Sequence, residues 1–198
     1  MFPGHTFLKF RCTGCGNCCR EPLLPLTDED VRRISRRTGD RPADIVTWVD
    51  RHGINMDDEP EAFVRLRQGK RVMILRHSHG GCRYLGKDGR CTIYTSRPLG
   101  CRVYPFDPDF TRKGKLRRLT LVKATPCPYE LDGETKIPDL RALHERYSDA
   151  HDDYNDKVAE WNVRQERRIR QGGAAQTARA FFVFLGLESD DEATTASA

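Results

Sequence analysis

The sequence predicts an α+β fold: a small, mostly antiparallel sheet with N-terminal helices, organised around a cysteine-rich site, plus a long C-terminal amphipathic helix. Three observations predict it. β-Prone runs separated by turn residues fill the middle of the chain. An apolar stripe with helical spacing runs from Leu140 to Trp161. Eight cysteines are grouped in three places along the first two thirds of the chain.

The size and composition of the chain indicate a single domain with appendages. Its 198 residues are 37% hydrophobic and 32% charged, which suits one core of moderate size under a highly charged surface. We expect residues 1–135 to form a cysteine-cluster domain, 136–187 to add a long helix and a docking segment, and 188–198 to be a disordered acidic tail.

The N-terminal residues and the hydropathy pattern predict a cytoplasmic protein. MFPGHTFLKF lacks the basic and apolar regions of a signal peptide, and no apolar run approaches the length of a membrane span. Because thiol buffers keep exposed cysteines reduced in the cytosol, four structural disulfides are disfavoured. The eight cysteines therefore point to metal.

Two helices are expected before the sheet. Thr27 is a candidate N-cap, followed by acidic residues in the first turn, with Val31 and Ile34 as the buried stripe. Gly39 is the expected end of this helix. The segment ADIVTWVDRHG, residues 43–53, has helical apolar spacing and predicts a second helix that ends at Gly53.

Residues 62–124 are expected to form the sheet. AFVRLRQGKRVMIL predicts a hairpin that turns at residues 68–70, and CRYLGKDGRCTIY predicts a second with Asp88 and Gly89 in its turn. Residues 116–124 alternate apolar and polar side chains, which predicts a further strand.

The long helix should begin beyond Pro138 and end near Gly172 and Gly173. Its stripe is expected to pack within the chain, and a protein partner bound through residues 139–170 is the alternative. ARAFFVFLGL, near the end, is too short to span a membrane and should dock as a last core segment.

The N-terminal cysteine run has the spacing of a metal-binding loop. C-x2-C is the usual chelating step for tetrahedral zinc and for iron–sulfur clusters, because a tight turn brings both sulfurs to one centre. Cys12, Cys15 and Cys18 form two fused steps, and Gly14 and Gly16 allow the backbone to wrap.

Cys19 adds a constraint on how many centres there are. Adjacent side chains of an extended chain point to opposite faces, so Cys18 and Cys19 should serve different centres or different metals of one cluster. Downstream cysteines must then close the coordination. The predicted metal ligands are Cys12, Cys15, Cys18, Cys19, Cys82, Cys91, Cys101 and Cys127.

Two histidines and two arginines lie near these cysteines in the sequence. His77 and His79 could ligate metal, but we expect them to be exposed residues at a strand end. Arg97 and Arg102 flank Cys101 and could compensate the negative charge of thiolates beside a bound cofactor. They could equally receive an acidic substrate or form ordinary ion pairs.

These motifs resemble a known family. FRCTGCGNCC, the stretch GGCRYLGKDGRCTIYTSRPLGCRVYPF and the CP at 127–128 are similar to the YkgJ-like CxxCxxCC cysteine-cluster proteins, labelled zinc- or iron-chelating domains. The resemblance spans residues 10–130 and implies metal binding. A related cluster occurs in flagellin lysine methylases, where an iron–sulfur centre is associated with methyl transfer.

The leading functional prediction is a metal-binding protein whose cysteines hold an iron–sulfur centre or a multinuclear iron or zinc site, with redox or group-transfer chemistry as a possible role. The alternative is a structural zinc module that binds partners without catalysis. Metal storage or delivery also stays open. No general base or nucleophile is identifiable, so enzymatic activity is undecided.

Nucleic-acid binding is disfavoured, because no groove-reading or base-stacking pattern accompanies the basic runs. Those runs contain Arg112, Lys113, Lys115, Arg117, Arg118, Arg164, Arg167, Arg168 and Arg170.

Overall fold

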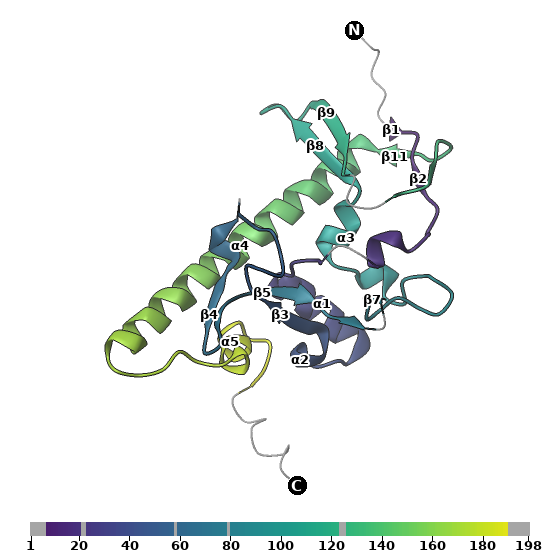
Figure 1. The fold of residues 1–198 in the computed structure, drawn as a ribbon. Coiled ribbons are helices and arrows are strands. Elements are labelled where there is room, and N and C mark those ends of the chain that lie inside the picture. The colour runs from purple at the N-terminus through teal and green to yellow at the C-terminus, as the bar shows by residue number, and fades with distance from the viewer. Residues whose placement is uncertain (1–6, 21–22, 58, 79, 123–125, 190–198) are drawn as a thin grey trace. The chain divides into compact units, whose positions relative to one another are not determined.

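The computed structural model describes residues 7–20, 23–57, 59–78, 80–122 and 126–189. The chain folds into two compact units (Figure 1). Unit 1 contains Met1–Leu24 and His77–Asp149, and unit 2 contains Pro25–Arg76 and Ala150–Ala198. Both combine helices with short strands, and the strand pairs in the described residues are antiparallel. The α+β class is confirmed.

Helix α1, Asp28–Thr38, opens unit 2 where the sequence places it. The Thr27 hydroxyl accepts a hydrogen bond from the Asp30 amide, and the Asp30 carboxylate accepts one from the Thr27 amide, which completes a capping box. Val31 and Ile34 are fully buried. Gly39 ends the helix in the left-handed conformation, with φ of 76°.

The second predicted helix is mostly wrong. Helix α2 covers only Pro42–Ile45, and the chain then enters strand β3, Val46–Val49. This run consists of β-branched and aromatic residues, which favour a strand when a partner strand is present. Strand β5, Gly69–Leu75, is that partner and pairs with β3 from Val46↔Leu75 to Val49↔Val72.

The first predicted hairpin is confirmed. Strand β4, Val64–Leu66, follows the 3-10 helix η2, Pro60–Ala62, and pairs with β5 in the order β3-β5-β4. Gly69 has φ of 101°, which suits the tight turn. Residues 72–75 of β5 are all buried and form the centre of unit 2.

The long helix is also confirmed: α4 covers Ile137–Arg170. Its residues 150–170 belong to unit 2, where Tyr154, Val158 and Trp161 are buried. Helix α5, Ala178–Phe184, docks Phe181 between the rings of Trp161 and Tyr154, at centroid distances of 5.1 and 6.4 Å. The stripe therefore packs within the chain.

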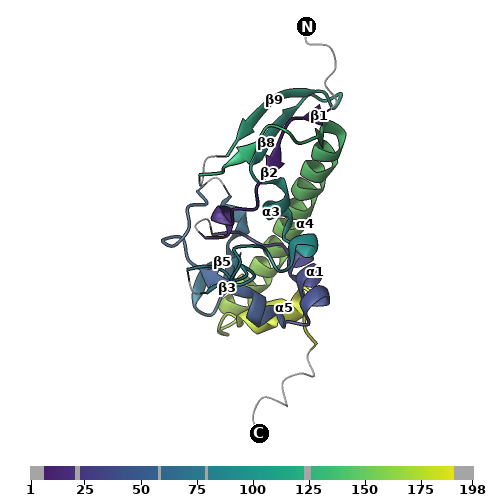
Figure 2. The ribbon, with the colours of Figure 1, turned by 90° about the vertical axis from the view of Figure 1, so that its right-hand side faces the viewer.

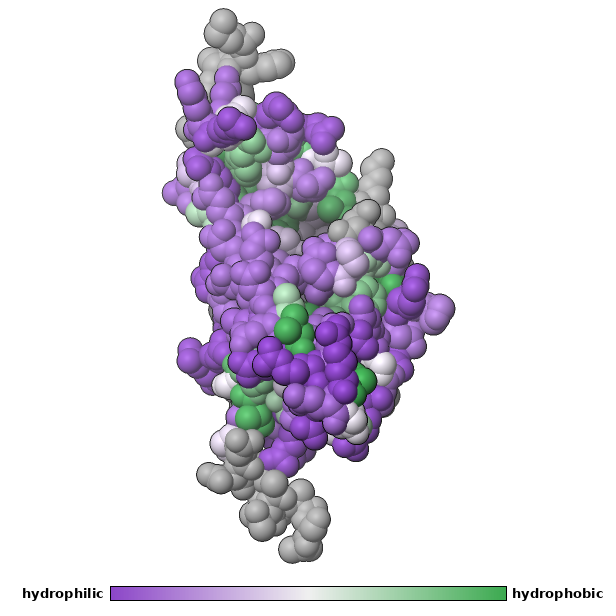
Figure 3. All heavy atoms as spheres, turned by 90° about the vertical axis from the view of Figure 1, so that its left-hand side faces the viewer, coloured by the Kyte–Doolittle hydropathy of each residue, from purple (hydrophilic) through white to green (hydrophobic). Residues whose placement is uncertain are grey.

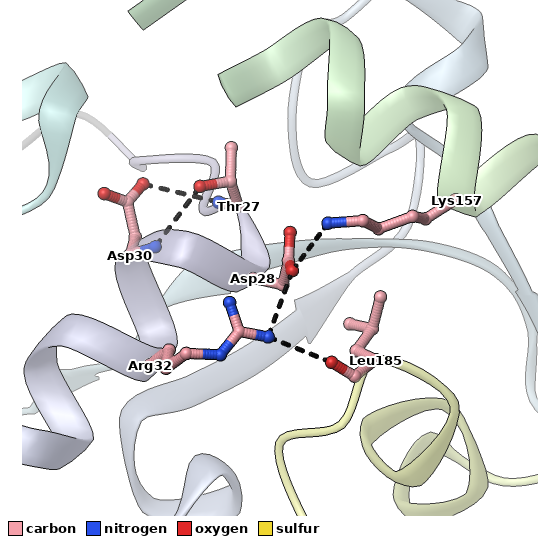
Figure 4. A network of polar contacts seen from close by, with 6 residues as sticks. All are labelled: Thr27, Asp28, Asp30, Arg32, Lys157 and Leu185. Atoms are coloured by element: carbon pink, nitrogen blue, oxygen red, sulfur yellow. Dashed lines mark hydrogen bonds and ion pairs between the residues drawn. The ribbon is translucent and has the colours of Figure 1, made fainter. Parts of the chain in front are cut away.

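A buried carboxylate joins three parts of unit 2 (Figure 4). Asp28 has a side chain that is 4% exposed, and it accepts hydrogen bonds from Lys157 at 2.8 Å and Arg32 at 3.3 Å. Arg32 also donates to the carbonyl oxygen of Leu185, just past α5. These contacts satisfy a charge that burial would otherwise make costly.

The strands of unit 1 form short separate pairs and are not joined in one sheet. Its strands are β1 (Phe7–Leu8) with β11 (Thr135–Lys136), β2 (Arg11–Cys12) with β10 (Tyr129–Glu130), β6 (His77–Ser78) with β7 (Gly81–Cys82), and β8 (Phe106–Phe110) with β9 (Leu116–Leu121). Figures 1 and 2 show β1, β2, β8 and β9 gathered at one end of this unit, with α3 (Leu99–Val103) beside them. The expected single sheet over 62–124 is thus wrong.

Of the second predicted hairpin, the structure contains one isolated β-bridge, between Leu85 and Cys91. Residues 86–90 form hydrogen bonds within the turn itself: the Gly86 amide donates to the carbonyl oxygen of Arg90, and the Arg90 amide donates to the Asp88 carboxylate. Strand β9 confirms the prediction for 116–121, and residues 123–124 of that prediction lie outside the described residues.

The described surface is strongly polar. On the face shown in Figure 3, hydrophilic side chains predominate and apolar ones form small separate groups. Among the described residues, no helix is both long and apolar enough to cross a membrane. Of the predicted disordered tail, Glu188 forms an ion pair with Arg179, and 190–198 lie outside the described residues. The expected domain boundaries at 135 and 187 stay a prediction.

Candidate metal centre

All eight cysteines belong to unit 1, and all eight are free of disulfides. The first, Cys12, ends strand β2. The loop that follows has Gly14 and Gly16 in the left-handed region, with φ of 70° and 74°. Glycine adopts this conformation without steric cost, so the backbone can wrap tightly around Cys15. The 3-10 helix η1, Asn17–Cys19, then presents Cys18 and Cys19 on one short turn.

Cys127 lies beside this loop although it is distant in sequence. Cys12 pairs in register with Tyr129 across β2 and β10. The Thr13 hydroxyl donates to the carbonyl oxygen of Pro128 at 2.8 Å, and the Asn17 amide group donates to that of Pro126 at 2.9 Å. These bonds bracket Cys127 and hold its segment against the N-terminal run.

Cys19 lies against the segment that carries Cys82. A Cβ at Gly81 would lie 2.9 Å from the carbonyl oxygen of Cys19, so the backbones nearly touch. Cys82 is buried in β7, opposite His77 in β6. His77 was expected to be exposed but is half-buried, and His79 lies outside the described residues. The Leu85–Cys91 bridge then returns Cys91 toward Cys82.

Backbone amides donate to three of the sulfurs. The amides of Gly14 and Tyr84 donate to Cys12 and Cys82, each at 3.4 Å, and the Ile93 amide donates to Cys91. In every case the donor lies two residues after the cysteine. An N–H group aimed at a sulfur stabilises the thiolate, which is the form that binds metal.

Cys18 and Cys19 interact directly. The hydrogen bond between their thiols raises the pKa of Cys18 and lowers that of Cys19. The extended chain expected at these two residues is wrong, because they lie in a 3-10 turn. Their thiols approach one another rather than pointing to opposite faces, and the assignment of Cys18 and Cys19 to different centres stays a prediction.

The remaining thiols also shift one another's pKa values. Burial raises the pKa values of Cys82, Cys91 and Cys101, and the negative charges of neighbouring thiolates raise them further. Cys101 lies on α3, with Cys82, Cys18 and Cys91 as its charged neighbours. For Cys127, burial and the charges of Cys12, Cys15 and Cys18 act in the same direction.

Arg97 compensates part of this charge. Its guanidinium lies over the Tyr94 ring at 4.0 Å, and its charge lowers the pKa values of Cys18, Cys91 and Cys101 against the opposing effects. Arg102 follows Cys101 in α3, and its role beside the thiols stays a prediction. Unit 1 as a whole has seventeen Lys and Arg against ten Asp and Glu.

The donor set fits a thiophilic metal, whereas the side-chain positions are not those of a formed site. Within the described ranges, no three His, Cys, Asp or Glu side chains are arranged to hold one ion. Thiolates repel one another without a cation between them, so convergence of the sulfurs is expected to accompany metal binding. Soft all-sulfur donors suit zinc and iron–sulfur clusters.

The comparison with protein families agrees with this chemistry. A family model described as "CxxCxxCC: Putative zinc- or iron-chelating domain" matches residues 11–128, which contain all eight cysteines. The chain belongs to the CxxCxxCC family. Membership in this family supports metal binding and leaves the choice between zinc and iron open.

Comparison with individual proteins adds one relative of this CxxCxxCC protein. The "Uncharacterized protein MJ0661" of Methanocaldococcus jannaschii is 29% identical over 110 residues. The match covers 55% of this chain and 50% of the relative, so the chain spans about half the length of that protein. No solved structure matches the chain.

Sequence reasoning missed the groups that surround the sulfurs of this CxxCxxCC protein. The amide donors at Gly14, Tyr84 and Ile93 share an offset of two residues, but a backbone amide has no residue-type signature. Gly81 and the hydrogen-bonding residue Asn17 were also missed. The glycine pair before Cys82 was the one available signal for a close backbone approach.

Proposed function

We propose that this chain chelates iron or zinc through its eight cysteines, and that an iron–sulfur centre is the favoured form. The observation that carries the proposal is the gathering of all eight free thiols in unit 1, with amide donors aimed at three of them. The excess of Lys and Arg in the same unit would offset the charge of the thiolates.

Sulfur-only ligation favours an iron–sulfur centre over a mononuclear iron site with oxygen or nitrogen ligands. Such a centre would supply one-electron redox chemistry or support group transfer. The protein would contribute thiolate ligands, amide hydrogen bonds to sulfur and the positive charge of Arg97, each of which tunes the potential of a cluster.

Structural zinc is the second candidate. Four cysteines satisfy a tetrahedral zinc ion, and tight glycine turns such as that at Gly14 and Gly16 are compatible with it. Under this alternative the metal organises unit 1 and function lies in partner binding. A partner at residues 139–170 would have to use the outer face of α4, where Val163 and Ile169 are 58% and 41% exposed.

The deciding experiment is analysis of iron, zinc and acid-labile sulfide in protein purified without oxygen, together with the visible absorption spectrum. Iron with matching sulfide and colour would support the iron–sulfur form, and colourless protein with zinc would support the structural alternative. A variant with serine at Cys12, Cys15, Cys18 and Cys19 is the control and should lose the metal. Metal-free wild-type protein, or a variant that keeps all its metal, would refute chelation by these residues.

A further inference from the structure

We propose that the end of unit 1 that carries strands β8 and β9 binds single-stranded nucleic acid. The binding surface combines the cations of the β8–β9 turn with an exposed aromatic ring, Tyr129. Basic runs in a sequence are weak evidence for nucleic acid when no stacking pattern accompanies them. In the folded chain, rings from distant positions supply that pattern.

The turn between β8 and β9 concentrates positive charge. Residues 111–118 contain five Lys and Arg and no Asp or Glu. Arg117 is paired with Asp109 at 2.7 Å. The other four are exposed, and in the described part of the chain no carboxylate forms an ion pair with them: Arg112, Lys113, Lys115 and Arg118. Cations gathered in this way on one loop attract the phosphates of a nucleic acid.

Helix α4 places a further guanidinium against the same turn. Gly114 has φ of 76°, and a Cβ on this residue would overlap the guanidinium of Arg141. The Arg141 Nε donates to Glu145 at 2.7 Å, while its terminal nitrogens lie against Gly114. The glycine thus lets an arginine approach a loop that is already positive. Like charges repel at such a site, and a bound phosphate would relieve the repulsion.

Three aromatic rings form a row beside the hairpin. Phe106, the first residue of β8, lies 4.7 Å from Phe10 in an edge-to-face contact, and Phe10 stacks on Tyr129 at 5.3 Å. Phe10 and Phe106 are half-buried, whereas Tyr129 is 43% exposed. The exposed ring is therefore backed by a packed one. A ring held in this way is a platform on which a base can stack.

The hairpin connects the rings to the cations. Strand β8 covers Phe106–Phe110, so its ends are separated by about 13 Å at about 3.3 Å per residue. Figures 1 and 2 show β8 and β9 at the same end of unit 1 as β2, whose partner strand carries Tyr129. A strand of a few nucleotides can span this length, with phosphates at the turn and a base on Tyr129.

A single strand suits this surface better than other anions do. The bases of a duplex are stacked on one another and offer no free face to Tyr129. Membrane binding favours apolar side chains that enter the bilayer, and the turn residues 111–115, TRKGK, include no large apolar side chain. An acidic peptide would pair with the cations but would leave the exposed ring without a role.

Binding of a fluorescent oligouridylate of about ten nucleotides tests the role of the turn. Lys113→Gln with Lys115→Gln should weaken binding and reduce the slope of log affinity against log salt by about 1.4, because each phosphate contact of a single strand contributes about 0.7. The matched control is Arg36→Gln with Arg37→Gln, which removes the same charge from α1 in unit 2 and should leave the slope unchanged. Equal losses in the two double variants would overturn the proposed surface.

Variants of Tyr129 test the stacking. Tyr129→Leu should weaken binding about fivefold or more, the usual effect of losing one base–aromatic contact, and Tyr129→Phe should restore it. Metal content and melting temperature of both variants separate a lost ring from a disturbed neighbouring cysteine. Wild-type affinity in Tyr129→Leu would refute the proposal. Equally tight binding of polyglutamate or of anionic phospholipid vesicles would also refute it.

Photocrosslinking locates the site in the unaltered protein. An oligonucleotide that carries thiouridine should crosslink to peptides that contain Phe10 or Tyr129. Crosslinks confined to unit 2, or no binding of the oligonucleotide at low salt, would overturn the inference. Neither result would bear on metal chelation, which is measured separately by metal analysis.

Discussion

Gly16 approaches Gly89 so closely that a Cβ on Gly16 would lie 2.6 Å from the carbonyl oxygen of Gly89. The contact presses the N-terminal cysteine loop onto the turn before Cys91. Gly14, two residues earlier, has nearly the same positive φ, but a Cβ on Gly14 would meet nothing within 4 Å. A substitution at Gly14 therefore measures the cost of backbone strain alone, whereas a substitution at Gly16 adds the cost of the lost contact with Gly89.

Alanine at these two glycines should therefore have unequal effects. Gly14→Ala should cost about 1–2 kcal/mol, the typical penalty for a left-handed alanine. Gly16→Ala should cost about 1–3 kcal/mol more, because a methyl group would force the loop away from Gly89. Thermal unfolding with metal bound, together with metal content, measures both. Equal losses in the two variants would show that the Gly16–Gly89 contact carries no energy.

Arg97 should strengthen metal binding through its charge. Arg97→Gln is expected to weaken the apparent metal affinity about tenfold or more, as loss of groups around a metal site commonly does. Arg97→Lys keeps the charge but loses the planar stacking on Tyr94, so its affinity should fall in between. Competition with a coloured chelator gives the affinities. Arg102→Gln is the matched comparison, and an effect as large as that of Arg97→Gln would assign the charge role to both arginines.

Lys157 should stabilise unit 2 through its bond to the buried Asp28. Lys157→Met should lower the free energy of unfolding by about 1–3 kcal/mol, because Asp28 then keeps Arg32 as its partner but loses one donor. Both tryptophans of the chain, Trp48 and Trp161, belong to unit 2, so their fluorescence in urea reports its unfolding. Addition of Asp28→Asn should remove most of the effect, and an undiminished loss in the double variant would assign it to another cause.

His151 should make unit 2 less stable in mild acid. Burial lowers the pKa of His151 below its usual value near 6.5, against the opposing charges of Asp30, Glu59 and Asp152. The unfolded chain then binds a proton at higher pH than the folded chain does. Stability is accordingly full above about pH 6.5 and falls as the pH drops toward the lowered pKa.

Urea unfolding between about pH 7.5 and 5.5, followed by tryptophan fluorescence, should show this decrease, and the slope cannot exceed about 1.4 kcal/mol per pH unit for a single group. His151→Gln should flatten the slope over this interval. A slope that persists unchanged in His151→Gln would assign the pH dependence to other groups, such as the carboxylates facing the histidine.

Local signals in the sequence predicted the parts of the fold that depend on local physics. Thr27, Asp30 and Gly39 define α1 because capping and a left-handed end are properties of neighbouring residues. Val46–Val49 forms a strand where the sequence predicts a helix, because its strand form depends on β5, some 25 residues later. The apolar spacing of this segment suits either structure until its partner is known.

The same distinction between local and long-range signals applies to the candidate site. The spacing of Cys12, Cys15 and Cys18 was readable, since chelation by a C-x2-C step is local. The position of Cys127 was not, because it depends on bonds that Thr13 and Asn17 make to carbonyl oxygens rather than on side-chain identity. The positive charge of Arg97 near the thiols was expected from its neighbourhood, while its stacking on Tyr94 was not.

Each unit is built from two separated stretches of the chain, so one stretch of a unit is synthesised well before the other. The bond from Thr13 to Pro128 spans 115 positions, so a growing chain exposes its first cysteines long before Cys127 is made. At ribosomal rates of about 5–20 residues per second, that delay is on the order of ten seconds. During this interval the nascent N-terminal thiols are open to oxidation or to capture of the wrong ion. A carrier that supplies metal to the finished chain would avoid both errors.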